Sequence, residues 1–67
     1  MLGQVLRDAR IAAGLTQEQL AAKARLSRNY VSLLELNVKS PTVQTLLRIC
    51  AALNVRASRI LARIERD

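Results

Sequence analysis

The segment TQEQLAAKARLSRNYVSLLEL, residues Thr16–Leu36, decides the fold of this chain. Thr16 and Ser27 each stand where a helix N-cap is expected, and a glutamine three residues after Thr16 completes a capping box. The small Ala21 lies where a second helix must approach closely. The segment therefore predicts two short helices, about residues 17–24 and 28–36, that meet through a tight corner.

The residues before this segment predict one helix over about residues 2–13. Gly14 can adopt the left-handed conformation that ends a helix, and Leu15 follows as the apolar residue of a Schellman motif. The expected inner face of this first helix consists of Leu2, Val5, Leu6, Ala9 and Ala13.

The residues after the segment predict two further helices. Asn37 tolerates the left-handed conformation and should end the preceding helix. Ser40 or Thr42 is expected to cap the fourth helix, with Pro41 in its first turn, and a last helix covers about residues 57–66. The buried stripe expected on the fourth helix consists of Leu46, Leu47, Ile49, Cys50 and Leu53.

The composition favours a single all-α domain spanning residues 1–67. A chain of 67 residues supports one small core. Half of the residues are apolar, yet Tyr30 is the only aromatic and Pro41 the only proline. Alanine, leucine, arginine and glutamine dominate, and all of them favour helices. We therefore expect a compact five-helix domain with a light aliphatic core.

The charge of the chain favours a polyanionic partner. Eleven lysines and arginines stand against five acidic residues, which gives a net charge of +6. Such a surface attracts nucleic acid and speeds its capture. The charge alone is also compatible with a basic protein that binds no nucleic acid.

Several other functions are disfavoured by the residues present. The chain has no histidine and one cysteine, Cys50, which lies on an apolar stripe and reads as a core residue. We therefore expect neither a metal site, nor a cofactor, nor an enzyme. No signal-peptide pattern is found, and the longest apolar run is too short for a bilayer, so a cytoplasmic location without membrane contact is expected.

Taken in order, the motifs of the chain resemble the lambda-repressor-like (Cro/phage-repressor, XRE-type) helix-turn-helix family. Within it, the run from Ser27 to Ser32 is most similar to the controller proteins of restriction-modification systems. The motifs that carry the resemblance are Arg7-x-x-Arg10, Gly14-Leu15-Thr16-Gln17, Leu20-Ala21, Leu26-Ser27-x-x-Tyr30-Val31-Ser32-x-Leu34-Glu35, Pro41-Thr42 and Leu46-x-x-Ile49-x-x-Ala52-Leu53-x-Val55.

The resemblance implies a five-helix DNA-binding domain whose third helix enters the major groove of double-stranded DNA. Arg28 and Asn29 begin that helix, at positions that face base edges in the family. Arginine can bond guanine O6 and N7 together, and asparagine can do the same with adenine N6 and N7. The alternative is that both residues are simply solvated polar residues at the start of a helix. Arginine is an unfavourable choice at that position, because its charge opposes the helix dipole.

Three further residues of this helix are candidate base contacts with open alternatives. Tyr30 either touches the DNA or partly buries its ring over the corner. Ser32 either bonds a phosphate or is a solvated helical serine. Leu33 is expected to be exposed, and it either contacts a thymine methyl or packs on a neighbouring subunit.

The family pattern also implies phosphate contacts and a structural bridge. Gln17, together with the amides at the start of its helix, would hold a phosphate. The alternative is an ordinary exposed glutamine. Arg10 and Glu35 match a family pair that joins the first helix to the third and sets its angle. The full set of expected phosphate contacts is Thr16, Gln17, Arg25, Lys39, Ser40, Thr42 and Gln44.

The chain departs from the family pattern at the corner and in the last helix. Arg25 replaces the usual corner glycine, which should cost about 1 kcal/mol if the corner keeps its left-handed conformation. The last helix lacks the usual cap and acidic first turn. Small family members commonly dimerise there, so Ile60, Leu61 and Ile64 are the expected dimer interface.

These observations lead to one main functional hypothesis and one alternative. The main hypothesis is a sequence-specific transcriptional regulator that binds double-stranded DNA as a homodimer. Its operator would be a (pseudo)palindrome with half-sites about 34 Å apart. The alternative is an antitoxin-type module that binds a partner protein and also its own promoter, through an apolar surface containing Leu33, Leu36, Ile60 and Ile64.

Overall fold

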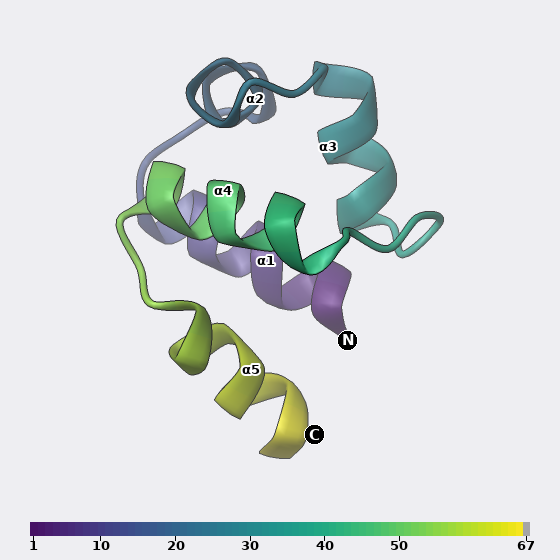
Figure 1. Ribbon diagram of the computed structural model, residues 1–67. Coiled ribbons are helices and arrows are strands. Elements are labelled where there is room, and N and C mark those ends of the chain that lie inside the picture. The colour runs from purple at the N-terminus through teal and green to yellow at the C-terminus, as the bar shows by residue number, and fades with distance from the viewer. Residues whose placement is uncertain (67) are drawn as a thin grey trace.

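The computed structural model describes residues 1–66, and within this range the chain forms five α-helices and no strand. They are α1 (Leu2–Ala12), α2 (Gln17–Ala24), α3 (Arg28–Glu35), α4 (Val43–Leu53) and α5 (Ala57–Arg66). Helices α2 and α3 lie together at one end of the molecule, α1 and α4 form its centre, and α5 lies at the opposite end (Figure 1). The predicted all-α, five-helix fold is confirmed.

The core is aliphatic and is formed by residues of all five helices. Two small residues of α2, Ala21 and Ala24, are buried in it and allow close approach of the neighbouring helices. Leu47 was expected to be buried but is 52% exposed, because it lies on the side of α4 that faces away from the core. The buried apolar residues are Val5, Leu6, Leu20, Ala21, Ala24, Val31, Leu34, Leu46, Ile49, Cys50, Leu53 and Ile60.

Four helix ends use a residue in the left-handed conformation. Gly14 follows α1 with φ 74°, and the amide of Leu15 donates to Arg10 O at 3.2 Å, as in the predicted Schellman motif. Arg25, Asn37 and Asn54 follow α2, α3 and α4 with φ of 58°, 60° and 58°. Each of these residues marks the end of its helix, because the left-handed conformation does not continue a right-handed helix.

The helix starts differ from the sequence predictions in a few details. The predicted capping box at Thr16 is present, since its hydroxyl accepts from Gln19 N and its amide donates to the Gln19 side chain. Thr42 and not Ser40 caps α4, and Pro41 lies before the cap instead of inside the first turn. Ala13 is an exposed C-cap and not part of the inner face. Helix α3 ends one residue earlier than predicted.

A close contact between α1 and the end of α3 depends on a glycine in the first turn of α1. Gly3 is buried, and a Cβ placed on it would lie 2.5 Å from Glu35 O and 2.7 Å from Leu34 O. The side chain of Asn37 accepts a hydrogen bond from Gly3 N at 2.9 Å. Asn37, which follows α3 in the left-handed conformation, therefore also accepts a hydrogen bond from an amide in the first turn of α1.

The corner between α2 and α3 keeps the left-handed geometry despite its arginine. We expect Arg25→Gly to raise the free energy of unfolding by about 0.5–1 kcal/mol, because relief of the left-handed strain exceeds the extra entropy loss of glycine. Urea unfolding of the two proteins measures the change. Arg25→Ala keeps the strain and removes the same charge, so an equal gain in both variants would refute the explanation.

Candidate nucleic-acid interface

The start of α3 presents two polar side chains to solvent. The Ser27 hydroxyl accepts from Tyr30 N at 3.0 Å and fixes the first turn of the helix. Arg28 and Asn29 follow directly and are both exposed. They therefore lie at the N-terminal end of the helix, with their hydrogen-bonding groups available to an external partner.

The start of α2 lies beside the start of α3. A shallow hollow of about 420 Å³ is lined by Arg10, Thr16, Gln17, Glu18 and Arg28. It brings two of the expected phosphate contacts, Thr16 and Gln17, to the same surface as an expected base contact, Arg28.

A second hollow continues this surface toward α1. It measures about 220 Å³, and its lining includes Arg7, Gln17 and Ser32. Arg7 is exposed and was not predicted as a contact residue, although it belongs to the motif that carries the family resemblance. Its guanidinium adds a positive charge beside Gln17 and Ser32.

The remaining candidates on α3 are less exposed than Arg28 and Asn29. Tyr30 is half-buried and packs against the core, as in the alternative in which its ring covers the corner. Ser32 is half-buried as well. Leu33 was predicted to be exposed but is half-buried. The exposed part of α3 is therefore concentrated at its first two residues.

The candidates in the α3–α4 connection and at the start of α4 are exposed but line neither hollow. They are Lys39, Ser40, Thr42 and Gln44. The Thr42 hydroxyl accepts from Thr45 N at 3.1 Å and donates to the Thr45 hydroxyl at 3.0 Å. It is therefore mainly a helix cap, and the amides at the start of α4 remain the groups suited to an anion.

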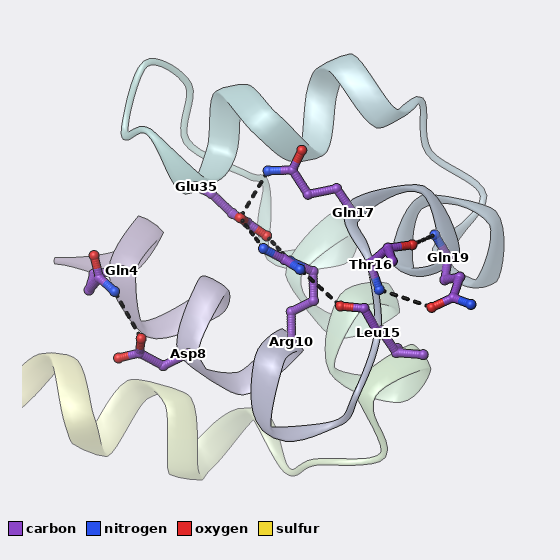
Figure 2. Close-up of polar contacts among 8 residues, drawn as sticks. All are labelled: Gln4, Asp8, Arg10, Leu15, Thr16, Gln17, Gln19 and Glu35. Atoms are coloured by element: carbon purple, nitrogen blue, oxygen red, sulfur yellow. Dashed lines mark hydrogen bonds and ion pairs between the residues drawn. The ribbon is translucent and has the colours of Figure 1, made fainter.

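A largely buried ion pair connects α1 to α3 (Figure 2), and both of its residues line the second hollow. Arg10 Nε donates to Glu35 Oε2 at 2.7 Å and Arg10 Nη2 donates to Glu35 Oε1 at 3.1 Å. The side chains are 12% and 4% exposed. The predicted structural bridge between Arg10 and Glu35 is present and is bidentate.

Two more contacts tie this pair to the start of α2. Gln17 Nε2 donates to Glu35 Oε1 at 3.1 Å, and Arg10 Nη1 donates to Leu15 O at 2.9 Å (Figure 2). Every buried side-chain polar atom in residues 1–66 has a hydrogen-bond partner. Three helices are thus held in a fixed relation at the surface that carries the candidate DNA contacts.

An arginine of α4 holds the corner from the other side. Arg48 Nη2 donates to Ala24 O and to Arg25 O, both at 2.7 Å, and Arg48 Nε donates to Ala24 O at 3.1 Å. Sequence reasoning missed this residue, because it lies more than twenty positions from the carbonyl groups that it contacts and no local pattern marks it.

The other titratable contacts lie away from this surface. A hydrogen bond from Gln4, together with the neighbouring Arg63, lowers the pKa of Asp8 below its ordinary value. Burial raises the pKa of the Cys50 thiol.

The described part of the chain contains no cluster of three or more side chains suited to a metal ion. Among residues 1–66, no helix is long and apolar enough to cross a membrane.

The domain is all-helical, α2 and α3 meet at a tight corner, the Arg10–Glu35 ion pair joins α1 to α3, and polar residues are exposed at the start of α3. These features define a helix-turn-helix domain. The sequence model of the helix-turn-helix family (HTH_3) matches residues 6–60. The chain belongs to this XRE/lambda-repressor-like family, as the motifs indicated.

Curated relatives support the same assignment. The chain is 38% identical over 61 residues to the transcriptional regulator ClgR of Mycobacterium tuberculosis, covering 91% of this chain and 54% of the relative. It is 38% identical over 60 residues to the immunity repressor protein of Bacillus phage phi105, covering 90% of this chain and 42% of the relative. The chain thus spans about half the length of these proteins.

Solved structures show the same fold. The clp gene regulator ClgR of C. glutamicum superposes with a TM-score of 0.87 at 34% identity, over 91% of this chain and 79% of that one. The restriction-modification controller protein C.AhdI of Aeromonas hydrophila gives a TM-score of 0.86 at 34% identity, over 88% and 86%.

Proposed function

We propose that this protein is a transcriptional regulator that recognises a specific sequence of double-stranded DNA. The observation that carries the proposal is the exposure of Arg28 and Asn29 at the start of α3, beside the hollow that contains Gln17. Two curated relatives are named as a transcriptional regulator and an immunity repressor, and the net charge of +6 favours DNA.

In this proposal the two sets of residues have different tasks. Arg28 and Asn29 read base edges in the major groove, where each matched bidentate pair contributes roughly 1–3 kcal/mol of discrimination. Gln17, Arg7 and the amides at the starts of α2 and α4 hold the phosphate backbone. Phosphate contacts provide affinity and register but carry little sequence information.

We also propose that the protein acts as a homodimer through α5 on a (pseudo)palindromic operator. The interface predicted from the sequence needs one correction, because Ile60 is 4% exposed and belongs to the core of its own protomer. Leu61 is 47% exposed, and Ile64 is half-buried against the core. Leu61, with the exposed edge of Ile64, is therefore the apolar surface that α5 offers to a second copy.

We expect Leu61→Lys to convert the dimer into a monomer, because a charge at the centre of an apolar two-fold contact is buried twice and has no partner. Light scattering at micromolar protein concentration, with and without DNA, measures the oligomeric state. Leu47→Lys also changes an exposed leucine, but on α4, and it is the matched control. A wild-type protein that is monomeric under both conditions would contradict the proposed dimer.

The test of the proposed function is selection of bound sites from random DNA, followed by gel shift with the selected site and a scrambled one. The selected sites give the half-site and the spacing, and hence the dimer geometry. A clear preference for the selected site supports a sequence-specific regulator. Equal binding of both DNAs at physiological salt would refute it.

The alternative function is an antitoxin-type module that neutralises a partner protein. The exposed apolar side chains of Leu36 and Val38, after α3, favour a protein-binding surface. Of the four residues predicted to form it, however, Ile60 is buried, and Leu33 and Ile64 are half-buried. Co-purification of a small partner protein in a defined complex would distinguish this function from regulation by DNA binding alone.

A further inference from the structure

Arg48 differs from the other exposed cations of the chain because its guanidinium is bound to the backbone of another helix. It donates to Ala24 O and Arg25 O through Nε and Nη2, with distances between 2.7 and 3.1 Å. These carbonyl groups stand at the C-terminal end of α2, where a helix leaves its last acceptors without intrahelical donors. A cation at this end also interacts favourably with the helix dipole.

The corner that Arg48 holds is the least favourable backbone position of the motif. Arg25 has φ 58° and ψ 46°, a conformation that glycine adopts at little cost and arginine does not. The backbone hydrogen bonds that close the corner include one from Leu26 N to Ala21 O, at 2.8 Å, and one from Arg25 N to Ala22 O, at 3.3 Å. The hydrogen bonds from Arg48 hold the next two carbonyl groups of the same turn, Ala24 O and Arg25 O.

The corner sets the direction in which α3 leaves α2. The start of α4 carries two of the expected phosphate contacts, Thr42 and Gln44. Gln44 is exposed one helical turn before Arg48. We propose that Arg48 is a positioning residue for DNA recognition: its clamp on Ala24 O and Arg25 O fixes the angle of α3 relative to α4. Base reading by Arg28 and Asn29 is thereby aligned with backbone docking through the start of α4. This inference rests on the proposed function.

The clamp predicts a specific change in binding. Arg48→Met should lower the ratio of affinities for the selected and scrambled DNA by about tenfold, because a tilted α3 misaligns one bidentate contact. Arg48→Lys keeps the charge but not the forked geometry and should fall between Arg48→Met and wild type. Arg56→Met removes the same charge at an exposed site and should weaken both DNAs alike, with the ratio unchanged.

Other roles of Arg48 give different results. If Arg48 contacted a phosphate directly, Arg48→Met would weaken both DNAs equally and reduce the salt slope by about one ion. If it only stabilised the fold, the variant would lose active protein and both affinities would fall by the same factor. Either result, with the ratio unchanged, would overturn the proposal.

A measurement without DNA separates this inference from the proposed function. Hydrogen exchange of the Leu26 amide reports on the corner, and it should become about tenfold faster in Arg48→Met but not in Arg56→Met. If wild-type protein shows no preference between DNAs, the regulator proposal fails, and unchanged exchange at Leu26 would show that the clamp is absent as well. Faster exchange together with an unchanged ratio in a sequence-specific wild type would refute the positioning role alone.

Discussion

Replacement of Glu35 by alanine is expected to lower the free energy of unfolding by about 3–5 kcal/mol, because it leaves a buried cation without its partner. The Arg10 side chain is only 12% exposed, and two of its three hydrogen bonds end on the Glu35 carboxylate. The same change removes the acceptor of Gln17. For so small a domain this is a large part of the total stability, and urea or thermal unfolding measures it.

Two controls show whether the buried charge is the cause. The double variant Arg10→Met, Glu35→Leu removes both charges and should be much closer to wild type than Glu35→Ala, since paired removal leaves no uncompensated ion. Glu65→Ala changes an exposed glutamate and should alter stability by less than about 0.5 kcal/mol. If Glu35→Ala were no less stable than Glu65→Ala, the role given to the bridge would be wrong.

The second large effect is expected in DNA discrimination. The double variant Arg28→Ala, Asn29→Ala removes both proposed base readers, each of which contributes roughly 1–3 kcal/mol against a wrong base pair. The ratio of affinities for selected and scrambled DNA should therefore collapse toward one, while weak binding to any DNA remains. Gel shift or fluorescence anisotropy at one fixed salt concentration measures the ratio.

Gln17→Ala is the matched comparison for this experiment. It changes an expected phosphate contact on the same surface, so it should weaken both DNAs by similar factors and leave their ratio near that of wild type. Unfolding curves for each variant check that the protein is folded at the temperature used. A double variant that keeps the wild-type ratio would contradict the assignment of base reading to the start of α3.

The sequence predicts local features of this fold well, because their partners are neighbours in the chain. The caps at Thr16 and Ser27 and the left-handed end at Gly14 each involve residues within a few positions of one another. The bridge from Arg10 to Glu35 spans 25 positions, and it was predicted only because the motifs resemble a known family.

The contacts that the sequence did not predict are long-range and depend on how the helices pack. Arg48 contacts the corner across 23 and 24 positions, and Asn37 accepts from Gly3 N across 34. The errors at Leu47 and Ile60 have a related cause. Helical spacing identifies the apolar face of a helix. Only the packed structure shows which part of that face another helix buries, and whether that helix belongs to the same chain.

The half-buried ring of Tyr30 also gives the protein a useful optical property. It is the only aromatic side chain in a chain without tryptophan or phenylalanine, and it packs against the core from within the recognition helix. All ultraviolet emission of the protein therefore originates from one known position on α3. A change in tyrosine lifetime on mixing with DNA would report on this helix alone, without an added dye and without background from the rest of the fold.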